Sequence, residues 1–178
     1  SLIFEFNKLH SSGQGLSGYS DLTSEHTVDD VNVALDSTDL PFTPVNGSFQ
    51  LQVLDTRTGL TETTDVFVKL NGLDDDTTLF DLVTAIDAVE GVSAAATPTR
   101  GIQITADNTN VEFSFANDSS GVLAALGLNS FFSGTSSSDI GVNEALANDA
   151  TKFAASLGGS GADSENAVRL AGFRDLSL

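Results

Sequence analysis

Two stretches of alternating apolar and polar residues, separated by a turn, constrain the fold of this chain more than any other feature. The first covers residues 48–54 and the second residues 65–70, with turn residues at 55–59 between them. A period of two places one apolar set on one face of each strand, so the pattern predicts an antiparallel hairpin. Its apolar face needs a second layer to bury against. The alternating apolar positions are Phe49, Leu51, Val53, Val66, Val68 and Leu70.

A helix and a second pair of alternating stretches follow. Residues 79–89 repeat apolar side chains at spacings of three and four, which predicts an amphipathic helix capped by Thr77 or Thr78. Residues 102–104 and 111–115 alternate again around a polar turn, and we expect them to form a second hairpin. Both hairpins and the helix should share one core. Its expected members are Phe49, Leu51, Val53, Val66, Val68, Leu79, Leu82, Val83, Ile86, Ile102, Ile104, Phe113 and Phe115.

Helical segments are expected near both ends of this sequence. Residues 2–9 follow one helical stripe that stops at Gly13, and no capping residue precedes it. Residues 163–178 predict a second helix with Asp163 as its N-cap. We expect both to be parts of longer helices that pack against each other, because short helices do not persist alone in water. The expected contact joins Phe6 and Leu9 to Leu170 and Ala171. The last two lie on a helix face formed by Ala167, Leu170, Ala171, Arg174 and Leu178.

The composition excludes several classes of function. The chain holds 25 acidic and 7 basic residues, a net charge of −18, which repels nucleic acid and anionic membrane surfaces. It has no cysteine, so disulfides, zinc–thiolate sites, iron–sulfur clusters and thiol catalysis are excluded. No apolar run approaches the roughly 20 residues of a membrane span, and no basic-then-apolar signal peptide is present.

The motifs that could carry chemistry have structural explanations. Residues 13–18 match G-x-G-x-x-G, but they follow a helix instead of joining a strand to a helix, so we interpret them as a flexible helix-ending loop. His10 and His26 are the only histidines, and two histidines without any cysteine make a poor set of ligands for a transition metal. We expect His10 to be a packing residue or a cation at a helix C-terminus.

The acidic runs also lack the pattern of a binding site. Residues 74–76 are three consecutive aspartates without the alternating spacing, glycine and distal glutamate of a calcium loop, and residues 107–110 lack them too. Helix capping and turn formation explain both runs. No pair among the carboxylates is marked as a glycosidase pair, and no G-x-S-x-G elbow or phosphate-binding loop occurs. We therefore expect no enzyme, no catalytic residue, no cofactor and no metal.

Two segments carry motifs that resemble a known family. Residues 2–15 contain the string N-x-L-H-x-x-G, which is similar to the end of the N-terminal rod helix in the family of flagellar hook-associated proteins. Residues 126–134 are similar to its L-G-L-N-x-F-F-x-G signature, and the extended piece at 138–143 follows in the expected order. The residues between them resemble the inserted repeat of flagellins. The matching positions are Asn7, Leu9, His10, Gly13, Leu126, Gly127, Leu128, Asn129, Phe131, Phe132, Gly134, Ile140 and Val142.

The resemblance implies an α+β fold in which a β-rich domain, hairpin–helix–hairpin, is inserted into part of a helical rod domain. Residues 39–135 would form the inserted domain, and residues 1–38 and 136–178 the two parts of the rod domain. The implied function is structural, joining hook to filament outside the cell after export through the flagellar secretion channel without a cleaved signal peptide. The implied partners are its own subunits in a ring or tube, the hook protein, the filament-side junction protein and an export chaperone.

Two alternatives stay open at this point. The chain could be another flagellar axial protein, either flagellin-like or a filament cap, which would lack the L-G-L-N-x-F-F segment. It could also be a β-rich surface adhesin or hydrolase unrelated to flagella, which would need a clustered ligand or carboxylate site.

Overall fold

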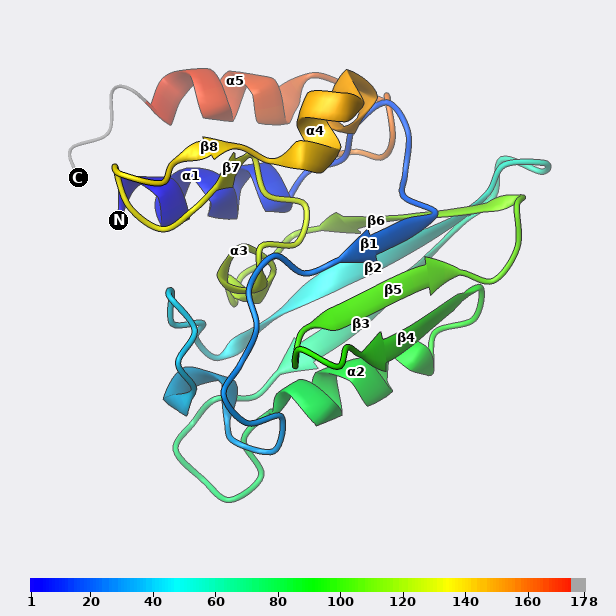
Figure 1. Cartoon of the computed structure of the whole chain (residues 1–178). Coiled ribbons are helices and arrows are strands. Elements are labelled where there is room, and N and C mark those ends of the chain that lie inside the picture. Colours follow the sequence, from blue (N-terminus) through cyan, green and yellow to red (C-terminus); the bar gives the residue numbers. More distant parts are fainter. Residues whose placement is uncertain (174–178) are drawn as a thin grey trace.

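The structure, a computed structural model, describes residues 1–173 and mixes helices with sheets (Figure 1). Short helical elements flank two three-stranded sheets and one two-stranded sheet. The elements in chain order are α1 Leu2–Ser11, β1 Asp21–Thr23, η1 Leu35–Ser37, β2 Gly47–Asp55, β3 Thr61–Val68, α2 Leu79–Asp87, β4 Val92–Ala96, β5 Ile102–Ala106, β6 Val111–Ala116, α3 Val122–Leu126, β7 Phe132–Ser133, β8 Gly141–Val142, α4 Glu144–Asn148, η2 Ala150–Lys152 and α5 Glu165–Gly172.

The first predicted hairpin is confirmed. β2 pairs antiparallel with β3, and Phe49 lies opposite Val66. The carboxylate of Asp55 accepts hydrogen bonds from the backbone N–H groups of Arg57 and Thr58, which shapes the turn. The register places the alternating apolar side chains of both strands on the core face.

The predicted helix after this hairpin is also confirmed. α2 begins with a capping box in which the hydroxyl of Thr78 accepts from the backbone N–H of Asp81 at 3.1 Å. The carboxylate of Asp81 in turn accepts from the backbone N–H of Thr78 at 3.0 Å. Of the two expected caps, Thr78 is the one used, whereas the hydroxyl of Thr77 accepts from the backbone N–H of Lys69.

The second predicted hairpin is wrong. β5 has β1 on one side and β4 on the other, so neither of its edges is open to β6. β6 pairs with β2 instead, and the turn at residues 107–110 carries the chain from one sheet to the other. The partner strand β4, Val-Ser-Ala-Ala-Ala, escapes periodicity analysis because Val92 is its only large apolar residue, so no alternation can be recognised.

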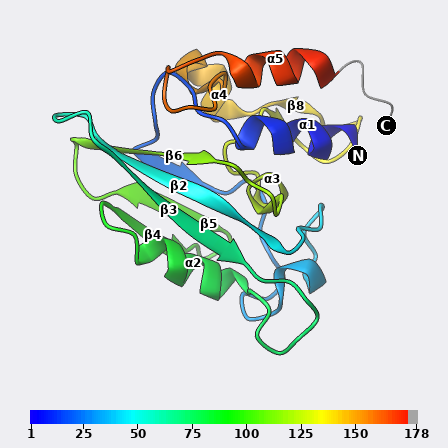
Figure 2. The same cartoon turned by 180° about the vertical axis from the view of Figure 1, so that it is seen from behind.

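The predicted core is nearly complete. All thirteen expected residues except Val53 are buried, and Val53 is partly buried against the same cluster. Two facing sheets and α2 supply most of it, and α2 lies on the side of the sheets away from α1 and α5 (Figures 1 and 2). β1, within the range expected to belong to the rod domain, pairs with β5 and so joins the sheets rather than the helices.

α1 and α5 lie side by side and antiparallel on the other side of the sheets (Figures 1 and 2). The Phe6 ring packs edge-on against Phe173 with 5.3 Å between ring centroids, and Asn166 donates to the carbonyl of Leu9. The predicted helix–helix contact is therefore present. Its α5 face differs from the expectation, because Asn166, Leu170 and Phe173 are buried while Ala171 is exposed. The expected face residues Arg174 and Leu178 lie outside the described residues.

Candidate functional site

The two segments that carry the family resemblance meet in the structure. Asn7, in the middle of α1, is 2% exposed, and both polar atoms of its side-chain amide bond to the segment entering β7. Its Oδ1 accepts from the backbone N–H groups of Phe131 and Phe132 at 3.1 and 2.9 Å. Its Nδ2 donates to the carbonyl of Phe132 at 2.9 Å. The side chain thus takes the place of a neighbouring strand for a short stretch of backbone.

His10, one helical turn further along α1, connects three segments. Its Nε2 accepts from the backbone N–H of Ala154 at 3.1 Å, so the proton of the neutral ring sits on Nδ1. Nδ1 then donates to the carbonyl of Asn129 at 2.8 Å. Burial lowers the pKa of His10 to about 4. The expectation of a cation at the helix C-terminus is wrong, because burial favours the neutral ring over any attraction to the helix dipole.

Asn129 completes this network and stands in the left-handed region, with a φ of 52°. Its Oδ1 accepts from the hydroxyl of Tyr19 at 2.8 Å. Its Nδ2 donates to the carbonyls of Ser11 and Gly13 at 3.2 and 3.0 Å. The carbonyls at the end of a helix have no partner within the helix, so Asn129 supplies one from a distant part of the chain. We call Asn7, His10, Gln14, Asn129 and Asn166 the polar junction.

The G-x-G-x-x-G run begins at this junction, and its three glycines are closely packed against other parts of the chain, whereas Leu16 is exposed. Gln14 pairs with Ser156 through its backbone, and its side chain donates to the carbonyl of Phe115 at 2.6 Å. A Cβ on Gly13 would lie 2.4 Å from Nδ2 of Asn166, and one on Gly15 would lie 2.2 Å from the carbonyl oxygen of Thr151. These glycines allow two backbones to approach, which is a structural role.

The other candidate residues are also used locally. His26 packs against the ring of Phe42, and burial lowers its pKa. The carboxylate of Asp76 accepts from the backbone N–H groups of Asn71 and Gly72, while Asp75 pairs with Lys69. Of the two roles expected for residues 74–76, turn formation is therefore the one that Asp76 performs. The carboxylate that caps α2 belongs to Asp81.

Asp118 is a structural carboxylate that the sequence reasoning missed. It accepts from the backbone N–H groups of Ser120 and Gly121, which directly precede α3, and of Leu123 in its first turn. Burial raises the pKa of Asp118. The available signal was an aspartate followed by Ser-Ser-Gly directly before the apolar run at 122–128.

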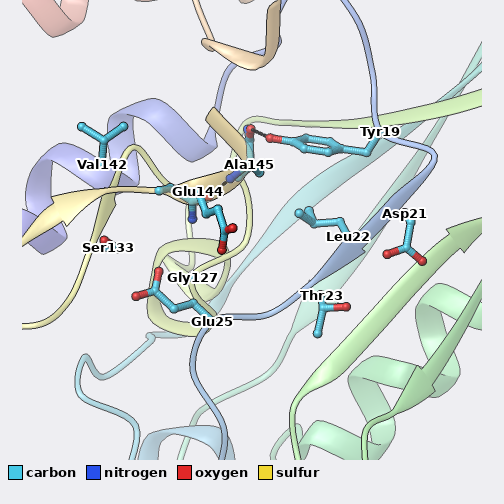
Figure 3. Close-up of a pocket in the computed structure, with 12 residues that line it drawn as sticks. Tyr19, Asp21, Leu22, Thr23, Glu25, Gly127, Ser133, Val142, Glu144 and Ala145 are labelled. Atoms are coloured by element: carbon cyan, nitrogen blue, oxygen red, sulfur yellow. Dashed lines mark hydrogen bonds between the residues drawn. The ribbon is translucent and has the colours of Figure 1, made fainter. Parts of the chain in front are cut away.

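A cleft of about 560 Å³ lies between β1 and the start of α4 and contains three carboxylates (Figure 3). Glu25 and Glu144 reach into it from opposite sides, and Asp21 lies apart from both. Asp21 accepts from the side chains of Gln103 and Thr105, and Glu25 accepts from the backbone N–H of Gly134. Within residues 1–173, no group of three or more His, Asp or Glu side chains is arranged to hold a metal ion.

No protein-family model and no curated protein matches this chain. Among the helices of the described residues, none has the length and apolar character needed to cross a membrane.

Proposed function

We propose that this protein is a structural component of the bacterial flagellum that joins hook to filament by protein–protein contacts. The observation that carries the proposal is the meeting of the two resembling segments, which are more than a hundred residues apart in the sequence. Asn7 bonds to Phe131 and Phe132, and His10 bonds to Asn129. Two of the positions that define the resemblance, Asn7 and His10, therefore also hold the two segments together, as expected if the pattern reflects a shared architecture.

The helical layer supports a second part of the proposal. α1 and α5 run antiparallel, so the start of α1 and the end of α5 lie at the same end of the layer (Figures 1 and 2). Such a pair is the arrangement expected where one domain is inserted into another. We propose that α1 and α5 belong to a helical rod domain from which the two larger sheets project.

This layer also offers apolar side chains to neighbouring subunits. Leu2 on α1 and Val168 on α5 are 54% and 69% exposed. We propose that copies associate head to tail through this layer into a ring or tube. The further partners in this proposal are the hook protein, the filament-side junction protein and an export chaperone, and the location is outside the cell.

The proposal includes no enzymatic activity, cofactor or metal. The polar side chains of the motif segments are occupied by hydrogen bonds within the protein, which favours a role in shape over a role in chemistry. Calorimetric titration with calcium and with zinc should give no heat of binding. Micromolar binding that also raises the melting temperature would contradict this part, because a ligand stabilises only the state that it binds.

Binding to isolated hooks tests the proposal. The protein as its own cell produces it should co-sediment with purified hooks and appear at one hook end by electron microscopy. A variant carrying Asn7→Ala should bind less, and one carrying Thr84→Ala, which changes an exposed position on α2, should bind as the wild type does. Failure of the wild-type protein to bind hooks would overturn the proposal and favour a surface adhesin. Self-polymerisation into long filaments would favour a flagellin-like protein.

A further inference from the structure

Residues 144–173, which we call the arm, contribute no buried side chain to the main hydrophobic cluster of the protein. The main hydrophobic cluster draws its buried members from residues 3–128. The buried apolar side chains of the arm lie outside that cluster. They are Leu146, Ala154, Leu170 and Phe173.

Hydrogen bonds to α1 and to the loop after it hold the arm in place. Ser156 and Gln14 exchange two backbone hydrogen bonds of 2.9 Å. Asn166 donates to the carbonyl of Leu9 at 3.0 Å. The backbone N–H of Ala154 donates to Nε2 of His10 at 3.1 Å. Of these bonds, the one to His10 depends on pH, because Nε2 can no longer accept a hydrogen bond once it carries a proton.

We propose that His10 is an acid-operated latch, so that protonation of its ring releases the arm from α1 while the two larger sheets stay folded. A proton on Nε2 would point at the N–H of Ala154, placing two donors against each other. Nδ1 already donates to the carbonyl of Asn129, so the ring has no other acceptor to turn to. The cation would also be buried without an opposite charge. Opening of the arm removes both penalties because it gives Nε2 access to water.

Among the described residues 1–173, no acidic side chain lies against the ring to stabilise the cation. The segment before β7 contributes Asn129 and Phe131, and the segment after η2 contributes Phe153 and Ala154. α5 contributes the uncharged Asn166, which bonds to Ala154. The charged groups on these elements are engaged elsewhere or exposed: Lys8 with Glu5, Lys152 with Asp149 and Ser17, and Glu165 and Arg169 at the surface.

The direction of the pH effect follows from the two pKa values. In the closed state the pKa of His10 is about 4, and in the open state it returns toward the ordinary 6.5. The open state therefore binds the proton first, and the closed state loses stability as the pH falls from 6.5 to 4. Between pH 7 and pH 5 the opening constant of the arm should rise roughly 20-fold. Asp118, whose pKa burial raises, acts in the opposite sense.

Amide hydrogen exchange of the whole protein tests the latch, with His10→Gln as the variant and His26→Gln as the matched control. We expect α5 amides to be less protected than β2 and β6 amides at both pH values, because the arm opens without unfolding of the sheets. In the wild type and in His26→Gln, α5 protection should fall about 20-fold from pH 7 to pH 5. In His10→Gln this fall should be nearly absent.

Three results would overturn the proposal. The first is equal exchange protection of α5 and of the sheets. The second is α5 protection in the wild type that does not change between pH 7 and pH 5. The third is a fall in α5 protection in His10→Gln as large as in the wild type. Should His10→Gln fail to fold, NMR titration of the two histidine rings in the wild type decides the matter. His10 should stay neutral down to about pH 4–5, and a His10 ring that titrates near 6.5 in the folded protein would exclude the latch.

Discussion

Replacing Asn129 by alanine tests the polar junction at its most connected residue. The substitution removes both side-chain functions, Oδ1 that accepts from Tyr19 and Nδ2 that donates to the carbonyls of Ser11 and Gly13. The carbonyls of Ser11 and Gly13 belong to buried residues, so water does not replace their lost bonds, whereas the side chain of Tyr19, which is 9% exposed, lines the cleft of Figure 3. The change therefore leaves three polar groups without a partner in the protein.

The expected loss follows from counting those groups. Each buried donor or acceptor left without a partner costs about 1–3 kcal/mol, so three of them cost roughly 3–6 kcal/mol after partial relaxation. Alanine at a φ of 52° adds about 1 kcal/mol that asparagine avoids. A total near 5 kcal/mol is comparable with the whole stability of many domains, which is roughly 5–15 kcal/mol.

Two companion variants separate these contributions. Asn129→Gly loses the same hydrogen bonds but tolerates the left-handed backbone, so it should be about 1 kcal/mol more stable than Asn129→Ala. Tyr19→Phe removes one donor and should cost only about 1 kcal/mol. The measurement is urea unfolding at pH 7 followed by circular dichroism. A loss of less than about 1 kcal/mol in Asn129→Gly would refute the account of a buried and fully used amide.

Three further outcomes are expected. Ile86→Ala in α2 should lower the free energy of unfolding by roughly 2–5 kcal/mol. The control Thr84→Ala, at an exposed position of the same helix, should lower it by less than about 0.5 kcal/mol. An unchanged melting temperature of Ile86→Ala would show that Ile86 is not packed. Gly15→Ala should separate the arm from the loop, because its Cβ would lie 2.2 Å from the carbonyl oxygen of Thr151, and wild-type exchange protection in α5 would contradict this. Tyr19 is the single tyrosine, and its pKa is raised by burial and, to a smaller extent, by the charge on Asp149. The ultraviolet absorbance of the folded protein should therefore show no tyrosine ionisation near pH 10.

Local patterns predicted the elements that depend on neighbours in the sequence. The β2–β3 hairpin followed from its alternation and its five-residue turn, and α2 from its stripe and Thr78 cap. The pairing of β5 and β6 could not be predicted in the same way. Alternation shows that a strand has two faces, but it does not show which strand lies beside it. β4 gave no signal, since its small residues hide the alternation.

The face of α1 shows a second limit. Counting apolar residues selected Leu2, Ile3, Phe6 and Leu9. Ile3 is buried as expected, but the buried face also includes Asn7 and His10, while Leu2 is exposed. Hydrophobic periodicity assumes that polar side chains face water. In the polar junction they are buried because backbone groups from residues 129–132 and 154 satisfy them. From the sequence, Asn7 was singled out only by the resemblance to hook-associated proteins, and His10 both by that resemblance and as one of the two histidines.

The most direct test of the proposed function is the position of the protein on the cell. Gold-labelled antibodies against residues 39–135 should mark one narrow band at the boundary between hook and filament of intact flagella. Label along the filament or at its distal tip would indicate another axial protein. Label on the cell body alone, with none at that boundary, would contradict the proposed role in joining hook to filament.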